Sequence, residues 1–448
     1  MGLNDTPSAE RKHIAFFGVR NAGKSSLVNK LTNQEMSLVS DVKGTTTDPV
    51  SKAMELTKAG PVLIIDTPGI DDTGELGEKR VERTRRILTK TDVAVLVTEC
   101  GRSLNEAEKE LIKLIKDREI PYITVRTKAD LYDDNQGEEA DNIAAENEAN
   151  DGKDGNDRGA DGNDRGSDGK DAAHGLGAKD KAADGTGKDG EAAQIIRVSS
   201  KTGQNIELLK QALTGLAAKG SGTDKHLVSD LLNEGDTVVL VIPIDESAPK
   251  GRLILPQQQT IRDILEKGCS AVVCRDTELA SVLKGMPAPR MVITDSQAYG
   301  KVSKIVPEEI MLTSFSILFA RYKGELESLK SGADKLAALK DGDKVLIAEG
   351  CTHHRQCNDI GSVKIPGWIR QYSKAEPEFH FSSGASFPED LKEYSLIVHC
   401  GGCMLNESEM KYRISKAKEH GVPMVNYGMA IACMNGILER CLKVFDMQ

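Results

Sequence analysis

Cysteine and histidine side chains in the last hundred residues form the pattern with the clearest capacity for chemistry. A strand-like apolar run at 394–398 leads into the motif HCGGC, and a second run at 344–349 leads into GCTH. If these runs are neighbouring parallel strands, their carboxyl ends bring both motifs to one edge of a sheet. Thiolate and imidazole groups gathered there would bind a soft or borderline metal. The candidate ligands of this predicted metal centre are Cys351, His353, His399, Cys400 and Cys403.

The spacing of these ligands leaves the identity of the metal open. Three cysteines are one short of the four thiolates that usually hold an iron–sulfur cluster, so a cubane here would keep one iron open to another ligand. His353 and His399 are the candidates for that fourth position. Three cysteines with one histidine are also a common tetrahedral zinc site. An iron–sulfur cluster, a zinc ion and the absence of any metal all stay open at this point.

Near the N-terminus, a glycine-rich motif predicts phosphate chemistry. A buried-strand run at 14–18 precedes GVRNAGKS, which fits GxxxxGK[ST], and a helical pattern follows it. In such a loop the backbone N–H groups cradle the phosphates, Lys24 reaches the β and γ oxygens, and the Ser25 hydroxyl binds Mg²⁺. The predicted phosphate-binding residues are Gly18, Asn21, Ala22, Gly23, Lys24, Ser25 and Ser26.

Three further motifs, each after a strand-like run, indicate that the bound nucleotide is a guanine nucleotide. The sequence DTPG at 66–69 is a DxxG motif, in which Asp66 holds Mg²⁺ through water and the Gly69 N–H meets the γ-phosphate. TKAD at 127–130 resembles the guanine-reading NKxD motif, with Thr127 where asparagine is usual, and SSK at 199–201 resembles the loop that backs the base. Together they predict a GTPase whose guanine contacts are Thr127, Lys128, Asp130, Ser199, Ser200 and Lys201.

Two details suggest a slow, potassium-stimulated GTPase. Ile70 stands where Ras-like proteins carry the glutamine that orients water. Asn21 and the segment GTTTD at 44–48 resemble the potassium-stimulated branch of the translation-type GTPases, in which that asparagine helps to hold K⁺. Thr46 is our candidate for the switch I magnesium ligand, with Thr45 and Thr47 as alternatives. The predicted catalytic residues are Lys24, Thr46, Asp66 and Gly69.

The length of 448 residues predicts more than one domain. Residues 133–193 are rich in Asp, Gly and Lys and almost free of apolar residues, which predicts a disordered insertion. Beyond it, strand-like runs at 237–244, 270–273, 291–294 and 311–318 alternate with helical patterns, as in a small parallel α/β domain. We expect an α/β protein with a P-loop GTPase domain at 1–218, a middle domain at 225–335 and a metal-binding domain at 340–448.

Composition and charge limit the partners and the cellular compartment that we expect for the protein. The net charge of −10 gives no electrostatic reason to expect a nucleic-acid partner. The first residues are polar, and no run approaches the ~18 apolar residues of a membrane helix, so we expect no membrane association. Nine cysteines, of which eight follow residue 268, favour metal or redox chemistry in a reducing cytoplasm over a disulfide framework.

The order of the motifs resembles one family closely. A GTPase followed by a small α/β domain and a terminal CxH…HCxxC motif resembles the HydF family of [FeFe]-hydrogenase maturation GTPases. The resemblance implies a [4Fe–4S] cluster on Cys351, Cys400 and Cys403, a middle domain that forms a homodimer, and a GTP-driven switch between partners. It further implies a scaffold that receives a two-iron precursor from the radical-SAM maturases HydE and HydG. The scaffold would then deliver the precursor to apo-[FeFe]-hydrogenase.

Two other functions compete with this interpretation. The first is a K⁺-dependent GTPase that acts in RNA modification or ribosome assembly and carries a structural zinc site. The acidic balance of the chain speaks mildly against it. The second is a metal-storage module whose GTPase half has lost its function. The presence of the GTPase motif residues argues against it: Lys24, Ser25, Asp66 and Asp130 are all intact.

Overall fold

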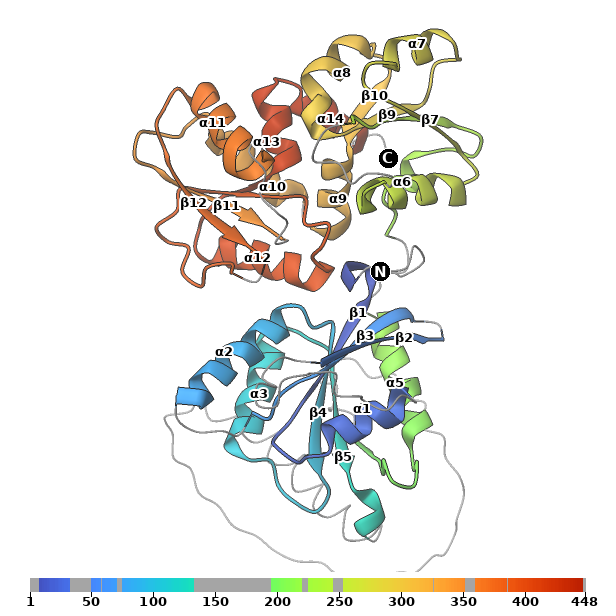
Figure 1. Ribbon diagram of the computed structural model, residues 1–448, viewed down its shortest axis with the longest axis vertical. Coiled ribbons are helices and arrows are strands. Elements are labelled where there is room, and N and C mark those ends of the chain that lie inside the picture. Colours follow the sequence, from blue (N-terminus) through green and yellow to red (C-terminus); the bar gives the residue numbers. More distant parts are fainter. Residues whose placement is uncertain are drawn as a thin grey trace, which may run out of the picture.

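The structure is a computed structural model. In the residues that it describes, three β-sheets with flanking helices follow one another along the chain (Figure 1). Thr46, Cys351, His353 and the predicted insertion at 133–193 lie outside the described residues. The described ranges are 8–32, 50–57, 59–70, 75–132, 195–219, 225–244, 253–324, 326–350, 359–384 and 386–445.

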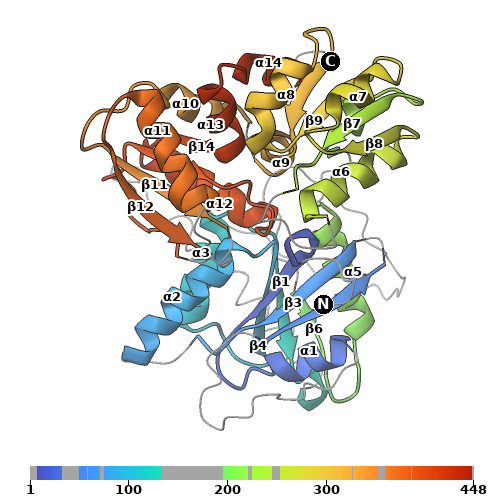
Figure 2. The same cartoon turned by 45° about the horizontal axis from the view of Figure 1, so that its top comes forward.

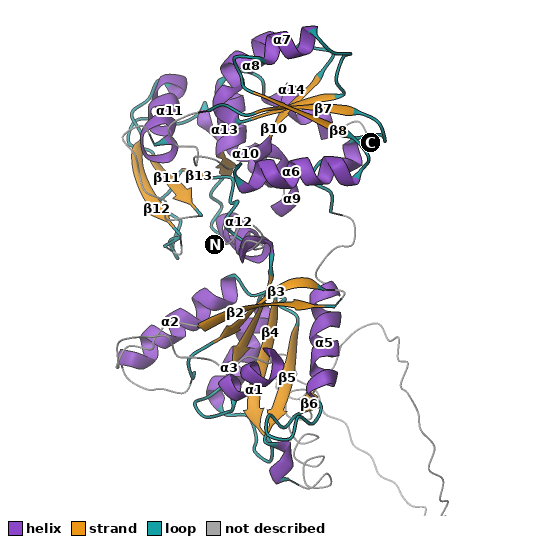
Figure 3. Ribbon diagram, turned by 45° about the vertical axis from the view of Figure 1, so that its right-hand side comes forward, coloured by secondary structure: helices purple, strands orange, loops and turns teal. Residues whose placement is uncertain are grey.

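The first sheet is the scaffold of the nucleotide motifs. Its order is β2-β3-β1-β4-β5-β6, and every pairing is parallel except that of β2 with β3. The central strands are near-continuous apolar runs because helices cover both faces (Figure 3). The elements are β1 (Lys12–Phe17), α1 (Lys24–Thr32), β2 (Val50–Leu56), β3 (Gly60–Asp66), α2 (Glu75–Thr89), β4 (Val93–Glu99), α3 (Glu106–Asp117), β5 (Tyr122–Thr127), β6 (Ile195–Arg197) and α5 (Ile206–Lys219).

The middle sheet is parallel throughout, in the order β10-β9-β7-β8. One expectation was wrong: the strand predicted at 311–318 ends at Ser314, and the rest of the run is helical. The Ser314 hydroxyl accepts a hydrogen bond from the Ile317 N–H at 3.3 Å and so caps the new helix. A fully buried apolar run has the same pattern in either conformation. The elements are β7 (Thr237–Val241), α6 (Leu255–Glu266), β8 (Ser270–Cys274), α7 (Leu279–Lys284), β9 (Met291–Thr294), α8 (Tyr299–Ile305), β10 (Met311–Ser314) and α9 (Phe315–Lys323).

The third sheet is also parallel, in the order β12-β11-β13-β14. Helix α10 lies within the range 225–335 that we assigned to the middle domain, yet it packs on this sheet. A Cβ placed on Gly332 of α10 would lie 2.2 Å from the Met424 carbonyl oxygen of β14. The elements are α10 (Leu326–Leu336), β11 (Lys344–Glu349), α11 (Ile365–Ser373), β12 (Glu378–Ser383), β13 (Leu396–His399), α12 (Glu407–Glu419), β14 (Met424–Asn426), α13 (Tyr427–Met434) and α14 (Leu438–Leu442).

Helix α12 is the part of the third domain that faces the GTPase domain (Figures 1 and 2). At its N-terminus, Asn406 Nδ2 donates to the Lys90 carbonyl oxygen at 2.8 Å, and Ser408 Oγ donates to Asp92 Oδ1 at 2.6 Å. Asp92 Oδ2 also accepts the His13 N–H of β1 at 2.7 Å. One carboxylate therefore joins the start of β1 to the start of α12. Within the described residues, no helix is both long and apolar enough to span a membrane.

Candidate functional site

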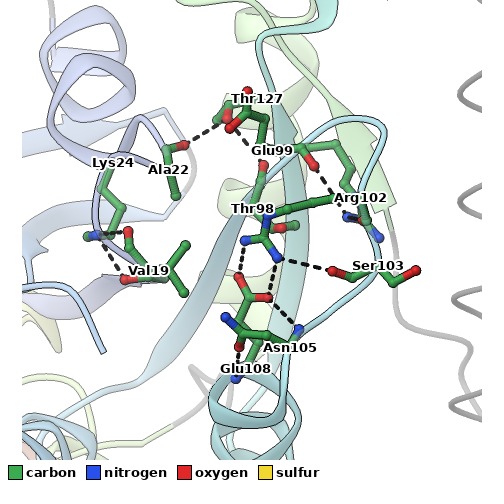
Figure 4. A network of polar contacts seen from close by, with 12 residues as sticks. Val19, Ala22, Lys24, Thr98, Glu99, Arg102, Ser103, Asn105, Glu108 and Thr127 are labelled. Carbon is green, nitrogen blue, oxygen red and sulfur yellow. Dashed lines mark hydrogen bonds and ion pairs between the residues drawn. The ribbon is translucent and has the colours of Figure 1, made fainter. Parts of the chain in front are cut away.

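The phosphate loop lies between β1 and α1, as predicted. Gly18 is required by a close approach, because an added Cβ would lie 2.1 Å from the Val97 carbonyl oxygen of β4. Lys24 is buried, and its Nζ donates to the carbonyl oxygens of Gly18 at 2.8 Å and Val19 at 2.7 Å (Figure 4). The ammonium group is thus held inside the loop, where phosphate oxygens can replace the two carbonyl oxygens. Asn21, on the exposed rim, has a left-handed backbone with φ of 62°.

Two of the residues predicted to hold Mg²⁺, Ser25 and Asp66, meet beside this loop. Ser25 Oγ donates to Asp66 Oδ2 at 2.6 Å, while Asp66 Oδ1 is buried and has no hydrogen-bond partner in the described part of the chain. Burial raises the pKa of Asp66, and the hydrogen bond from Ser25 and the charge of Lys24 oppose this rise. An unpartnered buried carboxylate oxygen beside a serine hydroxyl fits the coordination chemistry of magnesium and its bound water. Gly69 follows in the turn after β3.

Thr127 forms a direct hydrogen bond to the phosphate loop. Its Oγ1 donates to the Ala22 carbonyl oxygen at 2.7 Å and lies 3.1 Å from the Thr98 carbonyl oxygen (Figure 4). The side chain is buried, so this hydrogen bond is shielded from water. A threonine hydroxyl therefore connects the end of β5 to the loop between β1 and α1.

The other guanine-loop residues converge on the opening of a cavity of about 660 Å³. Asp130 accepts a hydrogen bond from Ser199 Oγ at 2.6 Å, and this bond lowers the pKa of Asp130. The carboxylate therefore stays ionised and can accept hydrogen bonds from guanine N–H groups. The lining includes Gly23, Ser26, Thr127, Lys128, Asp130, Ser200 and Lys201. Sequence motifs far apart in the chain thus share one nucleotide-sized pocket.

A half-buried ion pair lies next to the strand that leads into the guanine-binding TKAD motif (Figure 4). The Arg102 guanidinium donates to both carboxylate oxygens of Glu108 at 2.6 and 2.7 Å. The carbonyl oxygen of Arg102 accepts from Arg126 Nη1 of β5 at 2.7 Å. The loop after β4 is therefore fixed to the strand that carries Thr127.

The two strands that lead into the cysteine motifs end at the same edge of the third sheet. Strands β11 and β13 are parallel neighbours, with Ala348 opposite His399. The Gly350 N–H donates to Cys400 Sγ at 3.1 Å, so the residue before Cys351 already touches the second motif. The Gly402 N–H also approaches this sulfur, at 3.4 Å. Hydrogen bonds to cysteine sulfur atoms are also a feature of iron–sulfur sites.

Cys403 lies across the same turn and, like Cys400, is partly exposed. Burial raises the pKa of Cys403, and the positive charge of Lys323 opposes this rise most strongly. Among the described residues, no three His, Cys, Asp or Glu side chains are gathered as a metal site. The remaining candidate ligands, Cys351 and His353, lie outside those residues.

Both ring nitrogen atoms of His399 have hydrogen-bond partners. Its Nδ1–H donates to the Cys400 carbonyl oxygen at 2.7 Å, and its Nε2 accepts from Arg413 Nη1 at 3.0 Å. These partners fix the tautomer, because a carbonyl only accepts and a guanidinium only donates. Complete burial, together with the charge of Arg413, lowers the pKa of His399 to about 3, so the ring is neutral. Ligation of iron by His399 would require one of these bonds to break.

Sequence reasoning missed two supports of the cysteine turn, Lys323 and Arg413. Both are buried cations. Lys323 ends α9, which belongs to the middle sheet, and nothing in its local pattern connects it to a turn about 80 residues away. Arg413 follows Glu409 by one helical turn and pairs with it at 2.8 Å. That spacing is common on exposed helices, so it gave no sign of a buried role.

Comparison with known families covers the three domains in turn. Residues 13–128 match the family described as 50S ribosome-binding GTPase. Residues 227–324 match the hydrogen maturase F dimerization domain, and residues 327–444 match the hydrogen maturase F tetramerization domain. The chain belongs to the hydrogen maturase F family. Its first domain is a GTPase domain, its fold is mixed α/β, and its two other domains are of types named for oligomerisation.

Individual relatives resemble the GTPase part alone. GTPase Der of Wolinella succinogenes is 37% identical over 132 residues, which are 29% of this chain and 27% of that protein. The tRNA modification GTPase MnmE of Desulforamulus reducens is 36% identical over 104 residues, covering 23% of this chain and 22% of that protein. The chain thus spans about a quarter of the length of these relatives. Among solved structures, an Era variant of Aquifex aeolicus bound to GDP·AlF4⁻ is 16% identical with a TM-score of 0.34, covering 65% of this chain and 97% of that one.

Proposed function

We propose that this maturase F family member is a GTP-hydrolysing scaffold for an iron–sulfur cargo. In this proposal a [4Fe–4S] cluster is held by Cys351, Cys400 and Cys403. A two-iron precursor is received from radical-SAM maturases of the HydE and HydG type and transferred to apo-[FeFe]-hydrogenase. The observation that carries the proposal is the contact of the Gly350 N–H with Cys400 Sγ at 3.1 Å. It brings the start of one cysteine motif against the sulfur of the other, in a chain whose family is that of a hydrogenase maturase.

The nucleotide half of the proposal is derived from the chain's own groups. Lys24 would leave its two carbonyl partners for the β and γ phosphate oxygens, and the Gly69 N–H would meet the γ-phosphate. Mg²⁺, held through Ser25, Asp66 and Thr46, would neutralise charge on those oxygens. The guanine ring would lie in the 660 Å³ cavity, with Asp130 reading its N–H edge. Because Ile70 cannot orient water, turnover would be slow and would depend on K⁺ beside Asn21.

The cysteine turn carries two of the three proposed cluster ligands, Cys400 and Cys403. Backbone N–H groups on Cys400 Sγ offset the negative charge of a thiolate-bound cluster. Three cysteine ligands leave one coordination position for a fourth ligand, which suits a protein that accepts and releases a metal cargo. The bound cluster would supply an electron-accepting, ligand-exchanging centre at this sheet edge. The partly exposed Cys400 and Cys403 support access by a partner.

A route between the two sites supports the switch role. Helix α2 follows the DxxG motif and leads to Lys90 and Asp92, which contact Asn406 and Ser408 at the start of α12. That point is three residues beyond Cys403. A movement of α2 between GTP and GDP states would therefore reach the cysteine turn through direct contacts. This path couples nucleotide state to the exposure of the cluster site.

Anaerobic purification with metal analysis tests the proposal. Iron and acid-labile sulfide near four of each per chain, with the EPR signal of a reduced [4Fe–4S] cluster, is the expected result. Zinc at about one per chain without sulfide would contradict it and would favour a GTPase with a structural zinc site. Transfer to a partner is then measured as hydrogenase activity gained by apo-hydrogenase after incubation with the loaded scaffold.

A further inference from the structure

A buried lysine from the middle domain holds the cysteine turn of the third domain. Lys323 is the last residue of α9 and is only 5% exposed. Its Nζ donates to the carbonyl oxygens of Gly402 at 3.2 Å, Cys403 at 3.3 Å and Leu405 at 2.7 Å. These carbonyls belong to the turn that ends in Cys403 and to the residues that lead into α12.

The three carbonyl partners favour the charged form of the lysine, whereas burial lowers the pKa of Lys323 and the negative charge of neighbouring groups opposes that lowering. A carbonyl oxygen only accepts, and a primary ammonium has three N–H donors and no acceptor. Three carbonyl partners therefore match the ammonium form, whereas a neutral amine would present a lone pair to one of them. The Phe319 ring lies 5.6 Å from the same Nζ and adds a favourable cation–π contact. These contacts stabilise the Lys323 ammonium group in the protein interior.

The position of this charge matters because of what lies beside it. The sulfur atoms of Cys403 and Cys400 are close enough to interact electrostatically with Lys323. A buried charge of this kind acts through a low local dielectric, so it is screened far less than a surface lysine. We propose that Lys323 is a positioning residue of the cluster site, which fixes the Gly402–Leu405 backbone and supplies positive charge to the cluster thiolates. This inference rests on the proposed function of Cys400 and Cys403 as cluster ligands.

Two separate consequences follow for a reconstituted cluster. Reduction adds negative charge, so a buried ammonium nearby raises the reduction potential, and its removal lowers it. Fixing the turn pre-arranges Cys403 and its neighbours for binding, so loosening the turn lowers the amount of cluster retained. A lysine that merely capped carbonyl groups would affect retention and leave the potential unchanged.

The test compares Lys323→Met, Lys323→Gln and Lys323→Arg in the full-length chain, reconstituted anaerobically with iron and sulfide. Met and Gln should lower the midpoint potential in an EPR-monitored redox titration and reduce iron and sulfide per chain. Arg should keep the potential near that of the wild type. Gln retains hydrogen-bond donors without the charge, so it decides the question if Met does not fold. GTP hydrolysis should be unchanged in all three, and thermal unfolding followed by circular dichroism reports whether the middle and third domains are folded.

A matched control is Lys416→Met. Lys416 is a buried lysine of α12 that pairs with Glu389 and Tyr412 rather than with the cysteine turn. Its loss should leave the midpoint potential unchanged. The inference is overturned if Lys323→Met or Lys323→Gln has the wild-type potential, or if Lys416→Met shifts it equally. A wild-type protein that binds no cluster at all would instead refute the proposed function.

Discussion

Replacement of Thr127 by valine tests whether a hydroxyl group holds the phosphate loop to the guanine-binding strand. Thr127 has a single O–H donor, and the shorter of its two contacts is the 2.7 Å hydrogen bond to the Ala22 carbonyl oxygen. Valine has the same shape without the donor, so the Ala22 carbonyl would stay buried without this partner. Such a loss costs about 1–2 kcal/mol in the free energy of unfolding. If about 1 kcal/mol of this loss reduces the free energy of GDP binding, the Kd for GDP rises about fivefold.

The chain offers a matched control for this substitution. Thr124 lies on the same strand β5, is also buried, and its Oγ1 has no hydrogen-bond partner within the described residues. Thr124→Val therefore removes no bond, and stability should change by less than about 0.5 kcal/mol or increase slightly. Titration with a fluorescent GDP analogue and denaturant unfolding measure both quantities. The reasoning fails if Thr127→Val binds GDP as the wild type does, or if both variants lose the same stability.

Three other predictions concern cations, pH and assembly. GTP turnover should be faster in K⁺ than in Na⁺ at equal ionic strength, and Asn21→Ala should remove the difference; equal wild-type rates would contradict this. The hydrogen bond from Ser199 lowers the pKa of Asp130, so Ser199→Ala should raise that pKa. On acidification, the variant should therefore lose GDP binding at a higher pH than the wild type does. An unchanged pH profile of GDP binding would contradict this prediction. Val273 on the outer strand β8 is 49% exposed, so Val273→Lys should yield smaller oligomers in analytical ultracentrifugation, and an unchanged mass would exclude this edge as an interface.

The placement of the functional motifs could be predicted from sequence because each follows a strand. Parallel sheets bring loops at strand ends together, which is why Gly350 and Cys400 meet as expected. The same rule placed Lys24 beside Asp66 and Asp130 beside Ser199. The position of each motif after a strand is visible in the sequence, whereas the pairing of β1 with β3 and of β11 with β13 is seen in the structure.

Contacts between domains could not be predicted in this way. Lys323 and the cysteine turn meet because α9 packs against the third domain, and no local period records that packing. The hydrogen bonds of His399 likewise depend on Arg413, which reaches β13 from α12. The misassigned end of β10 has a related cause. Phe315, Ile317 and Leu318 are compatible with a strand or a helix by their local pattern, and tertiary packing together with the Ser314 cap favours the helix.

The most direct test of the account separates the cluster from the GTPase in one variant. Cys400→Ser should lose the [4Fe–4S] EPR signal and most of its iron and sulfide, because it removes the sulfur that accepts the Gly350 and Gly402 N–H groups. GTP hydrolysis should continue at the wild-type rate, since the nucleotide pocket lies in another domain. A variant that keeps its full cluster would contradict the assignment of Cys400 as a ligand. Loss of both cluster and hydrolysis would contradict the claim that a GTPase and a cluster scaffold fold as separate units in this chain.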